Sequence, residues 1–182
     1  MVLLITGTPG TGKSTLAAAI SLKVGWEHLD ANAIVEEKKL WSRVEQGARI
    51  VDMGKLSRAL APLIKKNRDV VIEGHLLCDI ELKSDYIVVL RTNPHTLRKR
   101  LTGRGYSKEK VDENVLAEAL DYCTIESESR YPTVYEVDTT DSKTKSLRHL
   151  MQIFNGKGKR FHAGRINWSK ELEELAVPPT IT

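Results

Sequence analysis

The residues whose spacing points most directly to chemistry form the stretch GTPGTGKST, residues 7–15. The stretch fits the pattern G-x-x-x-x-G-K-[ST] at every fixed position. Its glycines let the backbone wrap with N–H groups pointing inward, and a helix after it adds a positive N-terminus. An ordinary glycine-rich turn is the alternative, which the complete pattern disfavours. The stretch therefore predicts a loop that holds the phosphates of a nucleotide.

Each side chain of this loop has an expected role. Lys13 bridges the β- and γ-phosphates, Ser14 supplies a hydroxyl for Mg²⁺, and Thr15 touches the α-phosphate. Further contacts to the phosphates are expected from Gly10, Thr11 and Gly12. ATP and Mg²⁺ are therefore the expected cofactors.

A P-loop enzyme also needs a carboxylate at the end of a neighbouring strand to organise magnesium. Glu73 ends the apolar run VVIE, and Asp30 ends the run WEHLD. Glu73 is preferred, because VVI is typical of a buried strand beside the P-loop strand. His75 follows two residues later and is expected to orient the attacking group or a water molecule, although a lone histidine is more often structural.

Arginines are expected to neutralise the charge that phosphoryl transfer spreads over the transferring oxygens. Arg104 lies between Gly103 and Gly105, which predicts a mobile loop that carries one positive charge. Arg100 lies four residues earlier and shares a helix face with Arg104 if the helix continues that far. Both arginines are therefore candidate ligands of ATP.

Composition and length restrict the class of protein. A chain of 182 residues with 41% hydrophobic and 29% charged residues predicts one soluble domain. The formal charge of +4 is compatible with an anionic ligand or nucleic acid and requires neither. Two distant cysteines indicate reduced thiols, and the sequence contains no run of about 18 apolar residues, the length of a membrane span. We expect a cytoplasmic monomer.

Strands alternate with helices along residues 1–154, which predicts an α/β fold of three layers around a parallel sheet of five strands. Apolar runs place the strands at 2–6, 26–30, 69–74, 85–92 and 133–140. Helices are expected at 14–25, 54–67, 93–106, 107–129 and 142–154. The charged residues 31–53 are also predicted to be helical.

The composition changes after Phe154. Residues 155–182 have few apolar side chains, begin basic and become acidic, which predicts an extension that is ordered only on a partner. Basic and aromatic side chains in it would suit contact with RNA or a protein, although a solvated tail is the simpler interpretation. These side chains are Lys157, Lys159, Arg160, Phe161, Arg165 and Trp168.

Four short strings narrow the choice among P-loop proteins. KRLTGRGY (99–106) resembles the start of the adenylate kinase lid, where a similar string supplies arginines to the triphosphate. With GTPGTGKST, the strings VVIEGHLLCD (70–79), IVVLRTNPHTLRKRL (87–101) and RGYSKEKVDENV (104–115) resemble the adenylate kinase isoenzyme six family of archaea and eukaryotes. The resemblance covers about residues 2–150.

The resemblance implies the P-loop nucleoside-kinase fold and a nucleoside monophosphate kinase that transfers the γ-phosphate of ATP to AMP or a similar acceptor. It also implies ATPase activity. The kinase domain would cover 1–154, with a small monophosphate-binding region at about 30–53, a short lid at about 103–113 and a basic extension at 155–182. The family acts late in maturation of the small ribosomal subunit and the 3′ end of its rRNA, so the implied partner is a platform ribosomal protein, with contact to pre-rRNA.

The chain departs from the family pattern around the acceptor. Glu73 stands where the family often has aspartate. GHLL replaces the Gly-Phe-Pro-Arg string of ordinary adenylate kinases, so no arginine for the acceptor phosphate is obvious. Candidates for the monophosphate site are Asp30, Arg43, Arg49 and Arg91.

Two other functions stay open. A kinase of small alcohols, of shikimate or gluconate type, needs a carboxylate base, and Asp30 stands where such a base would be. An ATPase switch in ribosome assembly would use Glu73 and His75 to position water, with kinase activity incidental.

Overall fold

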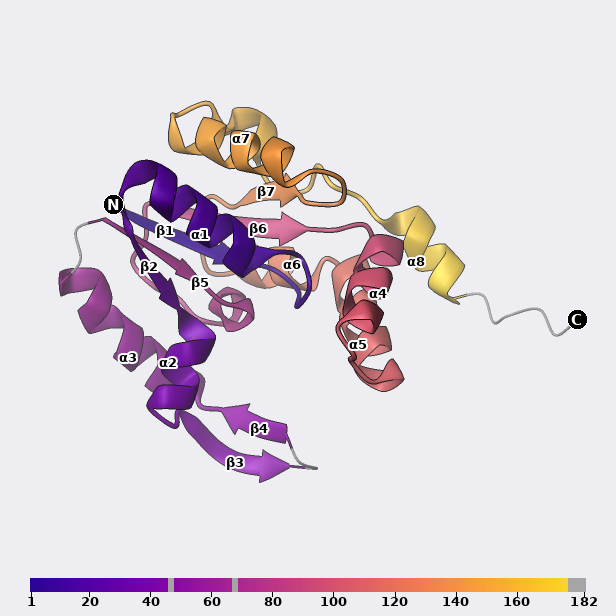
Figure 1. The fold of residues 1–182 in the computed structure, drawn as a ribbon, viewed down its shortest axis with the longest axis horizontal. Coiled ribbons are helices and arrows are strands. Elements are labelled where there is room, and N and C mark those ends of the chain that lie inside the picture. Colours follow the sequence, from indigo (N-terminus) through magenta and orange to yellow (C-terminus); the bar gives the residue numbers. More distant parts are fainter. Residues whose placement is uncertain (46–47, 67–68, 177–182) are drawn as a thin grey trace, which may run out of the picture.

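The computed structural model describes residues 1–45, 48–66 and 69–176 (Figure 1). In these residues the chain forms, in order, β1 (Val2–Thr6), α1 (Lys13–Val24), β2 (Glu27–Asp30), α2 (Ala31–Glu37), β3 (Trp41–Glu45), β4 (Ala48–Val51), α3 (Met53–Lys66), β5 (Val70–Glu73), η1 (His75–Asp79), β6 (Tyr86–Arg91), α4 (Pro94–Gly103), α5 (Lys108–Ala119), α6 (Tyr122–Glu128), β7 (Tyr135–Asp138), α7 (Lys143–Phe154), η2 (Gly158–Phe161) and α8 (Ser169–Ala176).

The central sheet has five parallel strands in the order β2-β5-β1-β6-β7. This topology confirms the predicted α/β fold. It also confirms that the VVIE strand lies beside the P-loop strand, with Glu73 paired in register with Ile5. The carboxyl ends of all five strands meet at one edge, which is where open α/β sheets bind ligands.

Alternate strand residues supply two hydrophobic clusters on opposite faces of the sheet. Leu3 and Ile5 pack with α1 and α7, which Figure 1 shows on the same side of the sheet. Leu4 packs on the other face with residues of α2, α3 and η1. Each fully buried aliphatic side chain contributes roughly 1.5–3 kcal/mol, so this core holds the strand ends rigidly in place.

Polar and glycine residues at the element ends fix where the helices around the sheet begin and stop. The Asp30 carboxylate caps α2, since its Oδ1 accepts from the backbone N–H groups of Asn32 (2.8 Å) and Ala33 (3.3 Å). Asn93 caps α4, as the sequence predicts, and Pro94 occupies the first turn. Gly25 ends α1 in the left-handed conformation with φ 73°.

Two predicted helices are wrong. The prediction of a helix over 31–53 holds only for α2, because Lys39 adopts φ 51° and the chain then pairs as the antiparallel hairpin β3–β4. The predicted helix over 107–129 is divided into α5 and α6. Asp121 adopts φ 57°, which a right-handed helix cannot contain, and its carboxylate binds Arg91.

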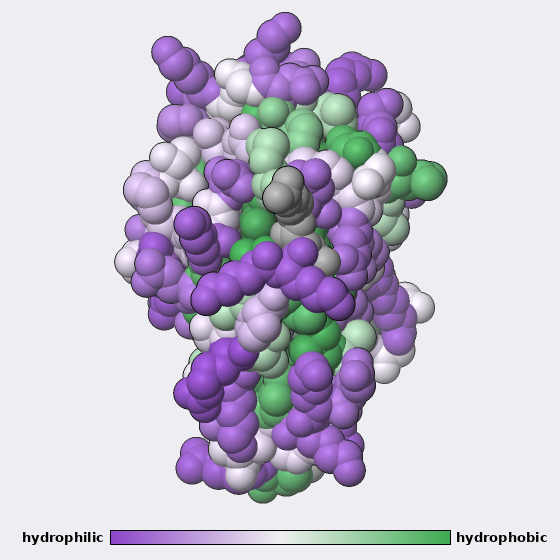
Figure 2. Space-filling view, turned by 90° about the vertical axis from the view of Figure 1, so that its left-hand side faces the viewer, coloured by the Kyte–Doolittle hydropathy of each residue, from purple (hydrophilic) through white to green (hydrophobic). Residues whose placement is uncertain are grey.

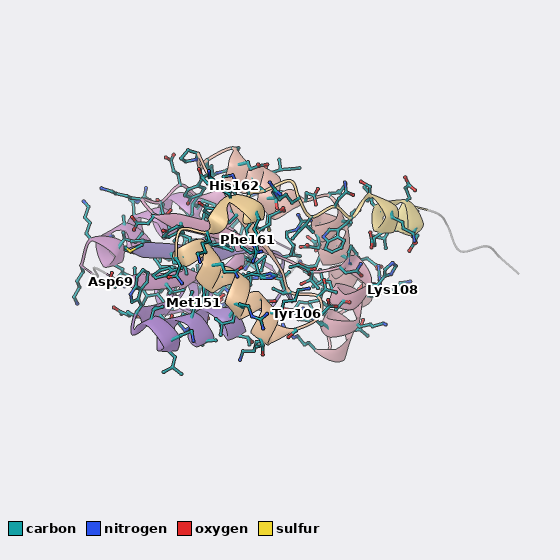
Figure 3. The ribbon with its side chains drawn as sticks, turned by 90° about the horizontal axis from the view of Figure 1, so that it is seen from above. Asp69, Tyr106, Lys108, Met151, Phe161 and His162 are labelled. Carbon is teal, nitrogen blue, oxygen red and sulfur yellow. The ribbon has the colours of Figure 1, made fainter. Side chains whose placement is uncertain are left out.

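The C-terminal extension also differs from its prediction, because residues 155–176 fold on the chain itself. Phe161 is only 9% exposed and packs in the cluster between α1, α7 and the sheet; Figure 3 shows it near Met151 of α7. His162 bridges to Tyr135 of β7, and Leu175 of α8 packs against α4 and α5. Residues 177–182 of the predicted extension lie outside the described residues.

The surface on the side of α3 is largely hydrophilic, with apolar side chains visible between charged ones (Figure 2). None of the helices in the described residues has the length and apolar character needed to cross a membrane.

Replacing Phe161 by alanine tests whether the extension belongs to the core. We expect Phe161→Ala to lower the free energy of unfolding by about 3–5 kcal/mol, because a large buried side chain leaves a cavity. Urea denaturation followed by circular dichroism measures the change. Leu22→Ala is the control, since Leu22 is 88% exposed and its loss should cost less than about 0.5 kcal/mol. Equal small losses would contradict the core role of the extension.

Candidate active site

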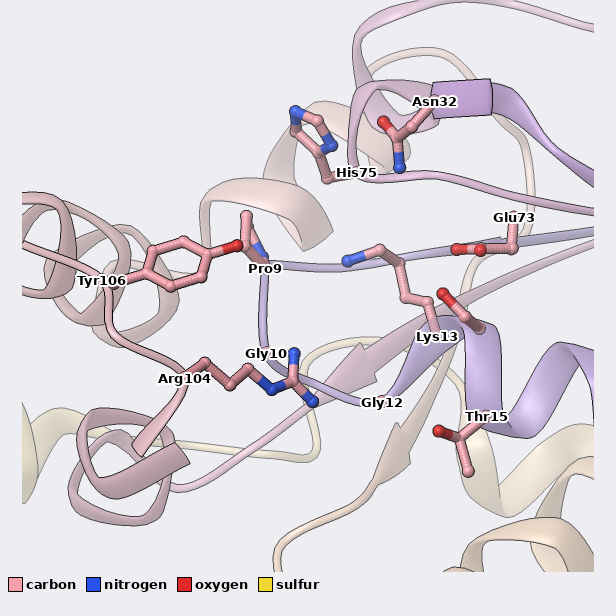
Figure 4. Close-up of a pocket in the computed structure, with 11 residues that line it drawn as sticks. Pro9, Gly10, Gly12, Lys13, Thr15, Asn32, Glu73, His75, Arg104 and Tyr106 are labelled. Atoms are coloured by element: carbon pink, nitrogen blue, oxygen red, sulfur yellow. The ribbon is translucent and has the colours of Figure 1, made fainter. Parts of the chain in front are cut away.

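A cavity of about 450 Å³ lies at the carboxyl edge of the sheet (Figure 4). Its walls come from the P-loop and the start of α1, from α2, from the end of β5 and η1, and from the loop between α4 and α5. The residues that line it are Pro9, Gly10, Gly12, Lys13, Ser14, Thr15, Asn32, Glu73, His75, Arg104 and Tyr106.

Two glycines of the P-loop are required by its conformation. Gly7 adopts φ +133°, and a Cβ atom there would lie 2.4 Å from the carbonyl oxygen of Leu90. Gly10 adopts φ +95°, and a Cβ atom there would lie 2.7 Å from a methyl carbon of Leu97. Larger residues at either position would force the loop away from β6 or α4, so the glycines fix the loop against its neighbours.

Lys13 is 7% exposed, and its ammonium reaches into the cavity beside the loop (Figure 4). Its Nζ donates to the carbonyl oxygens of Gly7 (2.8 Å) and Thr8 (3.1 Å). Burial lowers the pKa of Lys13, and the charge of Glu73 is among the groups that oppose this effect. The ammonium group of Lys13 is thus held in the cavity by backbone carbonyl groups of the P-loop.

Glu73 is buried at 1% exposure, and neither of its carboxylate oxygens has a hydrogen-bond partner among the described residues. Burial raises its pKa, the charge of Asp30 acts in the same direction, and the nearby Ser14 hydroxyl and Lys13 ammonium offset this rise only in part. Buried oxygens without partners next to a hydroxyl fit a hard cation such as Mg²⁺, which takes oxygen ligands and keeps several waters. The described residues contain no cluster of three His, Cys, Asp or Glu that could hold a metal by itself.

His75 opens η1 directly after the strand end and lines the same cavity. Burial lowers its pKa to about 4, and the positive charge of Lys13 acts in the same direction. The imidazole is therefore neutral at physiological pH. A neutral imidazole has one N–H donor and one acceptor nitrogen, so it can orient a phosphate oxygen or a water molecule.

Arg104 lies where α4 ends and points toward Gly10 in Figure 4. It lines the main cavity together with Tyr106, and it also lines an adjoining cavity of about 190 Å³. Arg100 lines only the smaller cavity, where its Nη2 donates to the carbonyl oxygens of Thr139 (2.7 Å) and Thr140 (3.0 Å). Both arginines thus line the smaller cavity, and Arg104 also lines the main one.

Four other predicted residues lie outside the lining of the main cavity. The Thr11 side chain is buried, and its hydroxyl donates to the carbonyl oxygen of Thr8 (2.9 Å). Asp30 is occupied as the cap of α2. Arg49 lies on β4 with its guanidinium paired to Glu36 and stacked on the Trp41 ring, 4.3 Å from its centroid. Arg43 is on the neighbouring strand β3.

Arg91 requires a correction. Its side chain is 2% exposed, and it forms ion pairs with Glu118 (2.8 Å), Glu136 (2.5 Å) and Asp121. Burial by itself would lower the pKa of Arg91, but these carboxylates raise it. The guanidinium is paired with these three carboxylates inside the fold. The structure therefore does not bring Arg91 to an acceptor phosphate. Its position at a strand end in the sequence does not reveal the three carboxylate partners.

Sequence reasoning missed Pro9, Asn32 and Tyr106 among the lining residues of the cavity. The one signal in the sequence for Asn32 is its position two residues after Asp30, where the predicted second strand ends. Tyr106 follows the glycine-bracketed Arg104, and the string RGY was the available signal.

Arg91→Met tests the buried ion cluster. We expect a loss of about 3–5 kcal/mol in the free energy of unfolding, because three carboxylates lose their common counter-charge. Chemical denaturation provides the value. Arg98→Met is the matched control, since Arg98 pairs with Asp112 at the surface and should contribute less than about 1 kcal/mol. A small effect for both variants would show that Arg91 is not structurally important.

The state of His75 predicts a pH dependence. In the folded protein its ring should titrate near pH 4, against the ordinary 6.5, in an NMR titration. Because the folded pKa is depressed, the stabilising contribution is present above pH 6.5 and is lost as the pH falls toward 4. Relative to His75→Gln, the wild-type protein should lose stability over this range. A ring that titrates near 6.5 would refute the buried neutral state.

Comparisons with known proteins agree with the fold and the P-loop. Residues 3–121 match the protein family described as an AAA domain. In solved structures, shikimate kinase from Bacteroides thetaiotaomicron superposes with a TM-score of 0.62 at 16% identity, covering 85% of this chain and 98% of that one. Deoxyadenosine kinase from M. mycoides with bound dATP gives a TM-score of 0.58 at 16% identity, covering 85% and 100%. These similarities show the fold.

Several archaeal relatives match this chain in sequence over nearly its full length. Proteins named "Putative adenylate kinase" are 33% identical in Methanocaldococcus jannaschii, over 94% of this chain and 94% of the relative, and 35% identical in Pyrococcus abyssi, over 96% and 95%. The protein of that name in Archaeoglobus fulgidus is 34% identical over 96% and 95%. The chain therefore belongs to the AAA-domain family and to the archaeal family of P-loop proteins that carry this name.

Proposed function

We propose that the protein transfers the γ-phosphate of ATP to a nucleoside monophosphate, with AMP as the first candidate. The observation that carries the proposal is that one cavity combines a P-loop lysine, a buried carboxylate without partners, a neutral histidine and an arginine of the α4–α5 loop. The names of the archaeal relatives support the same reaction. We also propose that the chain belongs to the adenylate kinase isoenzyme six branch, on the motifs described above.

The donor side of the reaction would use the P-loop. Backbone amides from Gly10 to Gly12 and the hydroxyl of Thr15 would hold the phosphates, and Lys13 would leave its carbonyl partners to bind the β- and γ-phosphates. Ser14 and Glu73 would hold Mg²⁺, which supplies neutralisation of phosphate charge when bound. The smaller cavity adjoins the loop through Gly10, Gly12 and Thr15, and the nucleoside part of ATP is proposed to extend toward it.

We propose a phosphate as the acceptor because Asp30, the carboxylate expected to act as the base for an alcohol, is engaged in capping α2. A phosphate acceptor is already ionised, whereas an alcohol needs a carboxylate to take its proton. Asp30, the candidate base, does not line the cavity, and its Oδ1 accepts two backbone N–H groups. The observation disfavours the alcohol-kinase alternative.

The transfer itself would depend on charge and exclusion of water. Lys13 and Arg104 would neutralise the transferring oxygens from two sides of the cavity, and His75 would orient the γ-phosphate or the acceptor. We propose a lid at about 103–113 that carries Arg104 and Tyr106 over the cavity and excludes water. The monophosphate-binding region is proposed at about 30–53, with Asn32 in the cavity wall and Arg43 and Arg49 on the hairpin.

Hydrolysis of ATP is the second candidate activity. The neutral His75 in the cavity wall supports this activity. The free nitrogen of a neutral imidazole can accept a hydrogen bond from a water molecule, which orients the water for attack. As an ATPase, the protein would act as a switch in late maturation of the small ribosomal subunit and the 3′ end of its rRNA. Its partner would be a platform ribosomal protein, and the resemblance of the motifs supports this role.

The protein is proposed to be a monomer located in the cytoplasm. The basic part of its extension is proposed to contact pre-rRNA. Lys157, Lys159 and Arg160 are exposed on the turn between α7 and Phe161, and Arg165 is exposed further along. Exposed cations of this kind bind phosphate backbones and release counterions. Phe161 is buried in the core and is not available to stack on a base.

Separating the nucleotides after incubation with Mg²⁺-ATP, with and without AMP, tests the function. If AMP is consumed and two ADP appear for each ATP used, the kinase proposal stands. Lys13→Ala should lower the rate by about 100-fold or more, because it removes a charge aimed at the transferring group. Lys23→Ala, at the exposed end of α1, is the matched control.

Other outcomes of this experiment reject the kinase proposal. ADP and free phosphate with AMP untouched would identify an ATPase. Consumption of ATP only after a small alcohol is added would favour the alcohol kinase.

A further inference from the structure

Glu118 of α5 is a buried carboxylate outside the cavity that binds four donors from distant parts of the chain. Its side chain is 1% exposed. Its Oε1 accepts from Arg91 Nε (2.8 Å), the backbone N–H of Thr92 (3.1 Å) and the indole Nε1 of Trp168 (3.2 Å). Its Oε2 accepts from the Thr8 hydroxyl (2.7 Å). An ionised carboxylate has about four acceptor positions, and here four donors are directed at it.

Thr8 is the member of this group that belongs to the P-loop. Its side chain is buried, and its carbonyl oxygen accepts from Lys13 Nζ (3.1 Å), Thr11 N (3.3 Å) and Thr11 Oγ1 (2.9 Å). The backbone of Thr8 thus holds the catalytic lysine, while its side chain is held by Glu118. The Thr8 hydroxyl thus links the P-loop directly to α5.

Trp168 connects the same carboxylate to the C-terminal extension. The extension is anchored on both sides of it, because the backbone N–H groups of residues 164–166 donate to Glu136 Oε2 and Leu175 packs on α4 and α5. Glu136 in turn pairs with Arg91, the other main partner of Glu118. The extension therefore binds Oε1 of Glu118, whereas the P-loop binds Oε2.

We propose that Glu118 is a positioning residue for the P-loop, acting through Thr8, and that Trp168 makes the C-terminal extension part of the same support. Glu118 does not line the cavity, so its effect on the reaction passes through the loop. A loop that is fixed before ATP binds does not lose conformational freedom at that step, and its amides and Lys13 are already aimed at the phosphates. The kinetic part of this inference rests on the proposed function.

Thr8→Val and Thr8→Ser form the matched pair that tests the inference. Valine keeps the shape of threonine and removes the hydroxyl, whereas serine keeps the donor. The first measurement is amide hydrogen exchange of residues 7–13 in the protein without nucleotide, at a temperature where circular dichroism shows each variant folded. We expect exchange to be about tenfold faster in Thr8→Val, since one net hydrogen bond is lost, and within about twofold of wild type in Thr8→Ser.

The second measurement is turnover with Mg²⁺-ATP and AMP. Thr8→Val should lower kcat/KM for ATP by about tenfold, with Thr8→Ser close to wild type. Trp168→Phe removes the indole N–H that binds Glu118, together with part of the ring volume, and should change both measurements in the same direction by a smaller factor. This variant keeps the test valid if Thr8→Val fails to fold. Trp26→Phe is the control, because Trp26 packs against Phe154, 4.9 Å between ring centroids, at the start of β2.

The outcomes separate this inference from the proposed function. If Thr8→Val and Trp168→Phe exchange residues 7–13 at the wild-type rate, the positioning role is wrong, even if their melting temperatures fall. If exchange rises as expected but wild-type protein does not phosphorylate AMP, the support of the loop stands and the kinase proposal fails. If Trp26→Phe raises exchange as much as Trp168→Phe, the effect is general loosening and the inference fails.

Discussion

Arg91 ends the strand β6, and its guanidinium is buried among carboxylates from α5, from the α5–α6 junction and from β7. A buried charge is tolerated only when its donors are all matched, since an unpaired one costs several kcal/mol. Arg91 ties the end of β6 to α5, α6 and β7, and the extension joins this group through Glu136 and Glu118. Asp121 even adopts a left-handed backbone conformation where its carboxylate reaches Arg91.

The cavity is linked to the buried Arg91 indirectly, through Glu118. Glu118 is shared between Arg91 and the P-loop, so the element that follows the α4–α5 loop is tied to the phosphate-binding backbone. The opposite wall is fixed differently, because Glu73 ends a strand that is buried on both faces and His75 follows that strand. One side of the site is thus held by buried ions and the other by hydrophobic packing.

Burial sets the protonation of the groups that face the cavity. Desolvation lowers the pKa of Lys13 and of His75 and raises that of Glu73. Each shift disfavours the charged form of a side chain in a buried space. In the proposed function, the phosphates of ATP would balance the charge of Lys13, and Mg²⁺ would balance the charge of Glu73.

The sequence by itself determined the P-loop, the parallel strands and the pairing of the VVIE strand with the first strand. These follow from local rules, because a glycine pattern fixes a loop and a continuous apolar run fixes a buried strand. The sequence also placed Lys13, Glu73, His75 and Arg104, which the structure brings to one cavity.

Only the tertiary structure decided what the remaining charges do. Arg91 looks like a phosphate ligand in the sequence, yet its carboxylate partners lie 27 to 45 residues away and become visible only when β6, α5 and β7 meet. The extension likewise has too few apolar residues to predict its burial from the sequence. In the structure, Phe161 packs in the core beside α1 and α7, and Trp168 donates to Glu118 of α5. Long-range contacts of this kind leave no periodic signal in the chain, because each depends on where distant elements pack.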